Sequence, residues 1–352
     1  MRAWAVVEHN QPLQELELPT PTPTGPEVLL EVTHAGVCHS DLHIWEGAYD
    51  MGSRGVLRLS QRGMTLPLVM GHEIVGRVVA WGPEAEGHVK AGDQRIVFPW
   101  AGCGQCAACR AEEENMCAQG RALGVYRHGG YATHVLAAHW KHLVPFDGID
   151  PALAATYACS GLTVFSAIRK VMPLPPEEPI VIVGAGGLGL QAVAVLRALG
   201  HRRILVVDIS AEKLEAARAQ GATDTVLAEG DATTKAIIAA AGGPVAAVID
   251  LVNGTSTARF AFDALRKGGR LIQVGLFGGE LAVPLPLMPI RALTLQGSYV
   301  GSVKELRELV ALAQQKGLPP IPITRQPLPT ADAALNRLRL GKVTGRIVLT
   351  AA

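Results

Sequence analysis

Four cysteines lie close together in the sequence with a spacing that suits a metal ion. Cys103, Cys106, Cys109 and Cys117 form the pattern C-x2-C-x2-C-x7-C in a loop that also contains glycines. Short spacings of this kind let one loop wrap a tetrahedral zinc whose four positions are all filled by thiolates. The alternative, free or disulfide-bonded cysteines, is hard to reconcile with four neighbouring thiols in a reducing compartment. The pattern therefore predicts a structural zinc site.

The two remaining cysteines could serve a second metal ion. Cys38 and Cys159 are far apart in the chain, and His72 lies between them in the tripeptide GHE. A catalytic zinc needs three protein ligands and one open position, and two thiolates with one imidazole are a known set. Spacing cannot show that these side chains meet. Taken singly, Cys159 is equally explained as a buried apolar residue and His72 as a structural histidine.

A glycine-rich stretch, VIVGAGGLGL at residues 181–190, predicts a dinucleotide site. A buried strand is expected at 180–183, a helix at 188–199 and a second strand at 204–207, which ends at Asp208. Gly184, Gly186 and Gly189 thus form G-x-G-x-x-G between a strand and a helix, with an acidic residue further on. The glycines allow a tight turn and a close approach of the pyrophosphate to the helix N-terminus. In isolation the glycines would fit a plain turn equally well.

Alternating patterns along the chain indicate the elements that must position these residues. Short apolar runs before residue 150 predict a β-rich, barrel-like domain, and residues 151–170 read as helical. A proline-rich connector follows at 173–179. Strands at 180–183, 204–207, 245–249, 271–274 and 292–295, separated by helices such as 211–220, predict a parallel sheet covered on both faces. A helix from Lys304, another at 331–340 and a strand at 346–350 should return to the first domain.

The composition fits a two-domain globular protein of the cytoplasm. The chain has 352 residues, of which 49% are hydrophobic, and a formal net charge of +1. This charge argues against a nucleic-acid or anionic-membrane partner. The first ten residues begin like a strand and lack the apolar core of a signal peptide. The apolar run at 180–199 is interrupted by glycines, Gln191 and Arg197, which disfavours a membrane span.

Together, these motifs resemble the zinc-containing medium-chain alcohol dehydrogenase family over essentially the whole chain. The resemblance is carried by CHSDLH from Cys38, GHE from Gly71, the four-cysteine loop, CSGLT from Cys159 and VGAGGLG from Val183, supported by VGLF, GSYV and the pair Gly345–Arg346. The stretch LTLQGSYVG is similar to the tetrameric microbial NAD-dependent branch, which prefers secondary and aromatic alcohols. The implied α/β fold has a GroES-like catalytic domain at 1–150 and 298–352 and a doubly wound, NAD-binding Rossmann domain at 151–297.

The resemblance implies that Cys38, His72 and Cys159 bind a catalytic zinc. Glu73 takes the position of a carboxylate that can transiently approach the metal. Asp41 is implied to accept a hydrogen bond from the His72 ring and so to fix its tautomer. The zinc would act as a Lewis acid on the alcohol oxygen.

A proton relay is also implied by the resemblance. Ser40 would take the alcohol proton and pass it through a nicotinamide-ribose hydroxyl to His43, whose unperturbed pKa of about 6.5 suits the last station. From the residues alone, Ser40 reads equally as a turn hydroxyl and His43 as a surface imidazole.

On the cofactor side, the resemblance implies contacts along the whole dinucleotide. Asp208 would bind the adenosine ribose, and because a carboxylate repels a 2′-phosphate, NAD is expected rather than NADP. His39 and Arg346 are candidates for the pyrophosphate, although Arg346 alone could be a surface charge. The implied cofactor residues are His39, Thr163, Gly184, Gly186, Gly187, Leu188, Gly189, Asp208, Val274, Leu276, Ser298 and Arg346.

Aromatic and apolar residues supply candidates for a substrate pocket. Trp45, Trp100, Leu276 and Phe277 would accept bulky alcohols and exclude water, although tryptophans are also common in cores. The stretch 49–65 looks longer than in relatives that act on short substrates. It could lie over the cleft or form a subunit contact.

The expected activity is therefore reversible hydride transfer between an alcohol and NAD, giving a ketone or aldehyde and NADH. The expected cofactors are NAD, a catalytic zinc and a structural zinc, and the expected assembly is a homotetramer built by pairing of the sheet edge at 293–298. One alternative is a dehydrogenase of the same fold acting on a polyol, an amino-acid alcohol or a CoA-linked alcohol. Another is a non-enzymatic, zinc-stabilised NAD sensor, in which Cys38, His72 and Cys159 would have no purpose.

Overall fold

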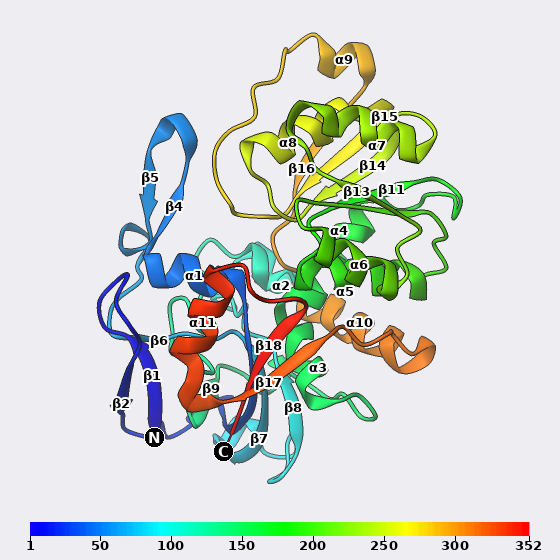
Figure 1. Cartoon of the computed structure of the whole chain (residues 1–352). Coiled ribbons are helices and arrows are strands. Elements are labelled where there is room, and N and C mark those ends of the chain that lie inside the picture. Colours follow the sequence, from blue (N-terminus) through cyan, green and yellow to red (C-terminus); the bar gives the residue numbers. More distant parts are fainter. Residues whose placement is uncertain (352) are drawn as a thin grey trace.

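A six-stranded, all-parallel sheet forms the centre of one half of the molecule (Figure 1). The computed structural model describes residues 1–351. The strand order is β13-β12-β11-β14-β15-β16, so the chain winds outward in both directions from β11. The strands are β11 (Ile180–Val183), β12 (Ile204–Asp208), β13 (Asp224–Leu227), β14 (Val245–Asp250), β15 (Leu265–Gln273) and β16 (Thr294–Gly297).

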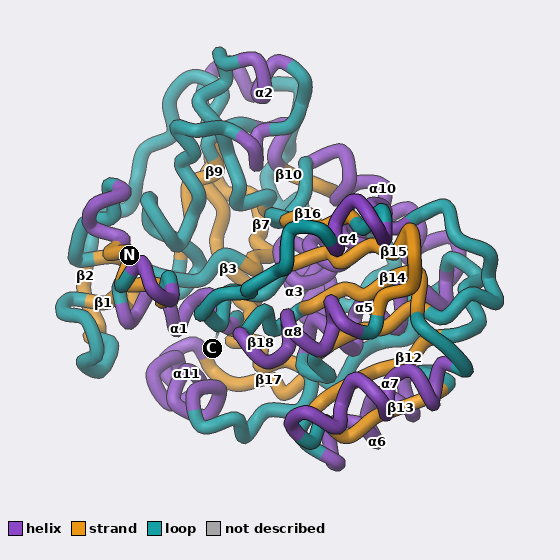
Figure 2. The backbone as a smooth tube through the Cα atoms, turned by 90° about the horizontal axis from the view of Figure 1, so that it is seen from above, coloured by secondary structure: helices purple, strands orange, loops and turns teal. Residues whose placement is uncertain are grey.

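Helices cover both faces of this sheet, because alternate residues of each strand point to opposite sides. In β11, Ile180 and Ile182 join one core cluster while Val181 and Val183 join another. Figure 2 shows strands of the sheet flanked by helices. The first cluster contains side chains of α4 (Leu162–Val171), α5 (Gly187–Ala198), α6 (Ala211–Gln220) and α10 (Val303–Lys316), and the second contains those of α7 (Thr233–Ala241) and α8 (Thr255–Asp263).

The other half of the molecule is rich in β-structure. A seven-stranded sheet has the order β10-β8-β7-β3-β18-β17, with β9 also paired to β3, and a smaller sheet has the order β2-β1-β6. Their strands are β1 (Arg2–Val6), β2 (Gln14–Glu17), β3 (Val28–Val37), β6 (Leu68–Val69), β7 (Glu73–Trp81), β8 (Gln94–Val97), β9 (His134–Ala137), β10 (Leu143–Val144), β17 (Ile323–Pro327) and β18 (Arg346–Thr350).

The C-terminal residues return to this second sheet. Strand β18 runs antiparallel to β3, with Ile347 opposite Val37, after α11 (Ala331–Arg339) has packed near α1 (His39–Glu46). Both chain ends consequently lie at the same end of the molecule (Figure 1). The fold class is as expected, whereas the domain boundaries at 150/151 and 297/298 stay a prediction.

Two kinds of element differ from the sequence expectation. Strands β13 and β17 were missed, because β13 is only partly buried and β17 ends in a proline and is mostly polar. The stretch 49–65 contains a hairpin of β4 (Ala48–Asp50) and β5 (Val56–Arg58), which stands out from the β-rich half (Figure 1). The remaining short elements are α2 (Ala107–Arg110), α3 (Pro151–Thr156), α9 (Leu287–Arg291) and single turns of 3-10 helix.

One helical stretch, 151–171, is long and apolar enough to cross a membrane by length and composition alone. Within the fold, 94% of its most apolar window is buried. Packing in the protein core accounts for its composition.

Candidate active site

Three side chains from distant parts of the chain meet in a fully buried cluster. Cys38 lies at the end of β3 and the start of α1, His72 directly before β7, and Cys159 between α3 and α4. One ligand atom of each lies within 4.8 Å of the other two. Cys159 lies in a single π-helical turn, Tyr157–Gly161, which connects α3 to α4. Such widened turns are frequent at functional sites, and this one places Cys159 opposite Cys38.

Asp41 holds two members of the cluster in place. Its Oδ2 accepts hydrogen bonds from the Cys38 backbone N–H at 2.9 Å and from the Tyr131 hydroxyl at 2.9 Å. Its Oδ1 lies 3.1 Å from Nδ1 of His72, the position expected from the family resemblance. Because Nδ1 faces Asp41, Nε2 of His72 is the ring nitrogen that can face the two sulfurs.

The cluster has the geometry of a metal site. The sulfurs of Cys38 and Cys159 are 4.0 Å apart, close to the separation of about 3.8 Å expected for two thiolates on one tetrahedral zinc. Nε2 of His72 is buried and has no hydrogen-bond partner, a costly arrangement unless a ligand occupies it. The three donors therefore fit a zinc with one open position.

Glu73 and Arg346 form a buried ion pair beside the cluster. Oε1 of Glu73 lies 3.0 Å from Nη2 of Arg346 and accepts the backbone N–H of Ser160 at 3.1 Å. Burial raises the pKa of Glu73 to about 7, although the Arg346 guanidinium opposes the shift. The other carboxylate oxygen has no partner, but Glu73 does not belong to the three-residue cluster. A role as a transient metal ligand stays a prediction.

The four sulfurs of the four-cysteine loop all lie within 4.8 Å of one another. The sulfurs are 3.9 Å apart for Cys103–Cys109, 3.5 Å for Cys106–Cys109 and 3.7 Å for Cys106–Cys117. These values bracket the spacing of about 3.8 Å for thiolates on a tetrahedral zinc. With four donors in place, the loop fits a closed, structural metal site.

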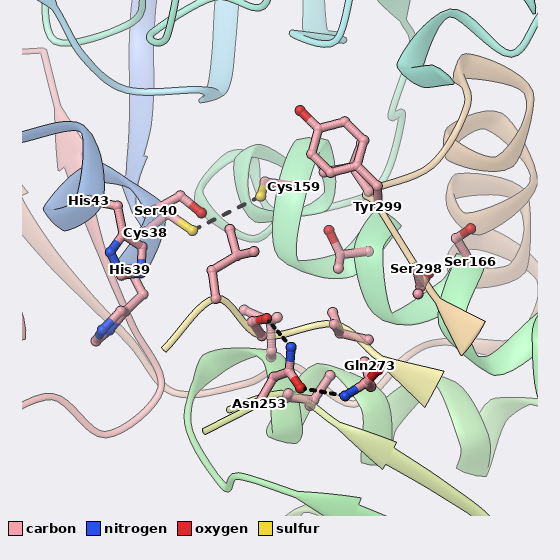
Figure 3. A pocket seen from close by; sticks show the side chains of 18 of the residues that line it. Cys38, His39, Ser40, His43, Cys159, Ser166, Asn253, Gln273, Ser298 and Tyr299 are labelled. Carbon is pink, nitrogen blue, oxygen red and sulfur yellow. Dashed lines mark hydrogen bonds between the residues drawn. The ribbon is translucent and has the colours of Figure 1, made fainter. Parts of the chain in front are cut away.

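A single cleft of about 1220 Å³ runs between the two halves of the molecule and reaches the three-residue cluster. Helix α1 presents His39, Ser40 and His43 to it (Figure 3). The His43 side chain is 12% exposed, so it can exchange protons with solvent. Burial lowers the pKa of His43, which keeps the imidazole neutral at pH 7. Ser40 and His43 thus share the cleft that their expected relay requires.

The glycine turn lines the far part of the same cleft. Gly184 adopts a φ of +99°, and a Cβ on Gly189 would lie 1.9 Å from the Gly184 carbonyl oxygen. A Cβ on Gly186 would meet open space, so this is where a pyrophosphate can approach the backbone. Oδ2 of Asp208 accepts the Ala185 N–H at 2.7 Å and so also stiffens the turn.

The remaining expected cofactor residues also line the cleft. Thr163, Val274, Leu276 and Ser298 lie there, as do Gly187, Leu188 and Arg346. Arg346 is 4% exposed, not a surface charge, and its Nε has no partner beside Gly187. The side chain of Asn253 bonds to Gln273 and to the Gly275 carbonyl on the floor of the cleft (Figure 3).

Trp45 does not line the cleft. It lies on another side of α1 from Ser40 and His43, where its indole N–H donates to the Gln11 carbonyl at 2.7 Å and Arg339 stacks over its ring. Trp100 does line the cleft, with its ring centroid 5.4 Å from that of His72. The sequence alone did not show that Trp45 lies on a different face of α1 from Ser40 and His43.

The hairpin of β4 and β5 forms one wall of the cleft. The sequence alone did not decide between this role and a subunit contact for residues 49–65. Tyr49 and Leu57 line the cleft. The hairpin also bonds to the loop after β15, because the hydroxyl and N–H of Ser53 donate to Oε2 of Glu280 at 2.7 and 3.3 Å. It therefore lies over the cleft, and a subunit contact is not needed to explain it.

Sequence reasoning also missed several side chains that line the cleft, namely Arg62, Asn115, Tyr126, Lys213 and Tyr299. No motif singles them out. For Lys213, its place in the first turn of the helix after Asp208 was the available signal.

Two family models match the chain. The model described as the alcohol dehydrogenase GroES-like domain matches residues 24–148, and that of zinc-binding dehydrogenases matches residues 187–315. The first spans Cys38, His72 and the four-cysteine loop. The second begins within the glycine turn.

Several known proteins are similar to this chain over nearly its whole length. The chain is 37% identical to proteins named NAD-dependent alcohol dehydrogenase from Sulfurisphaera tokodaii and from Saccharolobus solfataricus, with 99% of each chain covered. Among solved structures, the alcohol dehydrogenase of the hyperthermophilic archaeon Aeropyrum pernix is 31% identical with a TM-score of 0.89. That comparison covers 99% of this chain and 100% of the other.

Proposed function

Because the chain belongs to the zinc-containing medium-chain alcohol dehydrogenase family, we propose that it oxidises an alcohol reversibly to a ketone or aldehyde with NAD as acceptor. The observation that carries the proposal is the buried cluster of Cys38, His72 and Cys159 in the same cleft as the glycine turn. The names of the full-length relatives support NAD dependence.

The side chains around the cluster prepare it for this chemistry. When bound, zinc supplies a Lewis acid that lowers the pKa of the alcohol hydroxyl, and NAD supplies the hydride acceptor. Cys38, His72 and Cys159 hold the metal, and Asp41 orients the imidazole so that Nε2 faces it. Arg346 balances the charge of Glu73 and keeps that carboxylate beside the cluster.

The chain also supplies a route for the proton. Ser40 accepts the proton of the alcohol at its hydroxyl oxygen as its own hydroxyl proton is released towards His43, which then delivers a proton to solvent. A neutral imidazole is needed to receive a proton, and burial favours this form.

On the cofactor side, the glycine turn holds the pyrophosphate, with His39 and Arg346 as cationic or hydrogen-bonding neighbours. Asp208 receives the adenosine ribose and disfavours a 2′-phosphate. Thr163, Val274, Leu276 and Ser298 bound the nicotinamide end.

Three further features belong to this proposal. The catalytic domain comprises 1–150 and 298–352, and the cofactor domain comprises 151–297. Strand β16 ends the parallel sheet, and within residues 1–351 its outer edge has no partner, so it can pair with a second copy and build a homotetramer from two such dimers. The free thiols of all six cysteines favour the cytoplasm.

The test is NADH formation from NAD with primary, secondary, cyclic and aromatic alcohols, with zinc determined on the same sample. Turnover is expected with zinc in both cysteine sites. A full zinc load without turnover on any alcohol of the panel would refute this substrate range.

A further inference from the structure

A group of polar side chains surrounds the part of the cleft beside the metal cluster. Tyr49, Tyr126 and Tyr299 line it, and none of their phenol oxygens hydrogen-bonds to another of the described residues. The Tyr49 ring lies 5.1 Å from that of His43, and the Tyr299 ring meets that of Trp100 edge-on at 6.0 Å. Figure 3 shows Tyr299 reaching into the space beside Cys159. The tyrosines therefore stand next to the reacting end of the site.

The three phenols line the same cleft as the thiols of Cys38 and Cys159. Burial raises the pKa of Tyr49, and Tyr299, Tyr126 and Cys38 raise it further. Burial raises the pKa of Tyr299 to about 12, with contributions from Tyr126 and Cys159. Tyr299 is 53% exposed, so solvent weakens the electrostatic effects at its phenol.

Arg62 brings a positive charge to this chamber. It ends the 3-10 turn Leu59–Arg62, which Gly63 terminates with a φ of +91°, and it lines the cleft. No carboxylate of residues 1–351 lies within 4.0 Å of its guanidinium, and it makes no side-chain hydrogen bond there. By contrast, Arg169 in the same cleft is paired with Glu308. Arg62 is thus an exposed, unpaired cation at the edge of the chamber.

Two acidic residues, Glu112 and Glu113, also line the cleft and must be weighed against Arg62. Burial, the Tyr126 phenol and the Cys159 thiol raise the pKa of Tyr299, whereas the Arg62 guanidinium lowers it. The chamber also holds Asn115, whose side-chain nitrogen donates to the Tyr299 carbonyl at 3.1 Å. Arg62 is therefore the cation that opposes these two contributions at the Tyr299 phenol.

Arg62 and the three phenols supply hydrogen-bond donors, and the buried Oδ1 of Asn115, which has no partner, supplies one acceptor. A guanidinium offers only N–H donors, and each phenol can donate one O–H. A carboxylate, with about four lone-pair sites, matches several such donors at once and pairs with arginine in a charge-assisted manner. Aromatic walls next to it suit a ring that joins the two ends of a substrate.

We propose that this chamber is a subsite for a carboxylate at the far end of the substrate, so that the preferred alcohols are ring-containing hydroxy acids paired with Arg62. The tyrosine hydroxyls complete the hydrogen bonds of the carboxylate, while the alcohol hydroxyl reaches the metal cluster. This inference rests on the proposed alcohol dehydrogenase activity and defines its substrate class.

The test compares substrates that differ only at the far end. The values of kcat/KM with NAD are measured for 4-(hydroxymethyl)benzoate, its neutral carboxamide and the cationic 4-(aminomethyl)benzyl alcohol. A longer pair, 3-[4-(hydroxymethyl)phenyl]propanoate and its amide, tests whether Arg62 lies farther from the metal cluster than the shorter substrate can reach. The carboxylate with the higher kcat/KM is then compared with its own amide. We expect the carboxylate to be favoured about 10-fold at low ionic strength, mainly through KM, with the preference declining as salt is added.

Matched arginine variants identify the source of the preference. Arg62→Gln should reduce the carboxylate-to-amide ratio to about one, and Arg62→Lys should retain part of it. Arg58→Gln is the control, because Arg58 is an exposed arginine of the nearby hairpin that does not line the cleft. It should keep the wild-type ratio.

Three outcomes would overturn the inference: equal use of carboxylate and amide, preference for the cationic alcohol, or an equal effect of Arg58→Gln and Arg62→Gln. The second would assign the chamber to Glu112 and Glu113. These failures are distinct from failure of the proposed function, which would appear as no NADH formation from benzyl alcohol or any other alcohol.

Discussion

Glu114 is expected to control how tightly the four-cysteine loop holds its metal. Its side chain is 3% exposed and accepts the Gly102 N–H at 2.8 Å and His142 Nε2 at 3.1 Å, with Lys141 forming an ion pair. Gly102 precedes the first cysteine, whereas His142 and Lys141 belong to the body of the β-rich half. One carboxylate therefore fastens both ends of the loop to the domain.

Replacing Glu114 with glutamine tests this role. The amide oxygen can keep the Gly102 bond, but its NH2 group would face the His142 and Lys141 donors. The Lys141 side chain is 36% exposed, so its contribution is screened and small. Losing the charge-assisted bond to buried His142 should cost about 2–3 kcal/mol, which corresponds to about 30- to 150-fold faster opening of the loop.

The assay is the release of zinc to a chelating dye under native conditions. Zinc bound to the four-cysteine loop is identified as the kinetic phase of release that is absent in Cys106→Ser. This phase should become faster in Glu114→Gln. Glu113→Gln, a change at the exposed neighbour, is the control and should release zinc at the wild-type rate. Equal rates in Glu114→Gln and wild type would refute the reasoning.

The same carboxylate predicts a pH dependence. Burial alone would raise the pKa of Glu114, but hydrogen bonds from His142, Gly102 and Lys141 hold it well below its usual range. A depressed folded pKa stabilises the protein above the unfolded value of about 4.3, and this stabilisation is lost as the pH falls towards the folded value. The difference between wild type and Glu114→Gln should therefore be constant near neutral pH and shrink below about pH 4.3.

Three other changes probe the cleft. Cys38→Ser should abolish turnover yet leave NAD affinity within about twofold, measured by calorimetry, because the glycine turn is untouched; retained turnover would remove Cys38 from the metal site. Gly189→Ala should weaken NAD binding at least about 10-fold, because the added Cβ would collide with the Gly184 carbonyl; wild-type affinity would contradict the close packing. Ser53→Ala removes the hydrogen bond from the Ser53 hydroxyl to Glu280, an exposed contact of about 0.5–1 kcal/mol. NADH release, measured by stopped-flow fluorescence, should become about two- to fivefold faster. An unchanged rate would show that the hairpin does not restrain the loop after β15.

The parts of this molecule that sequence predicts well are those set by local interactions. The glycine turn needs a strand, a turn and a helix that follow one another, and all three occur at β11 and α5 as expected. The four cysteines likewise lie within fifteen residues, so a single loop can bring them together. In both cases the sequence pattern and the spatial site nearly coincide.

The parts that sequence did not reveal depend on pairings across the chain. Nothing near Glu114 indicates that His142 will lie beside it, since the contact depends on how η5 (Trp140–His142) joins the body of the domain. Trp45 was a pocket candidate because it is aromatic, but a helix turns by about 100° per residue and α1 presents Trp45 to the Gln11 carbonyl instead. The chamber of three tyrosines draws on three separate segments, and no spacing could link them.

The last strand shows how such pairings build the site itself. Strand β18 pairs with β3 so that Arg346 reaches the Val37 carbonyl at 3.2 Å and Oε1 of Glu73 at 3.0 Å. Glu73 in turn lies opposite Gly36 on β3, where a Cβ would come within 2.2 Å of its free oxygen. A buried carboxylate without a counter-charge would be costly, and one beside a larger residue would not fit. The C-terminal arginine and the glycine in β3 are thus both required for a carboxylate to lie beside Cys38 and its partners.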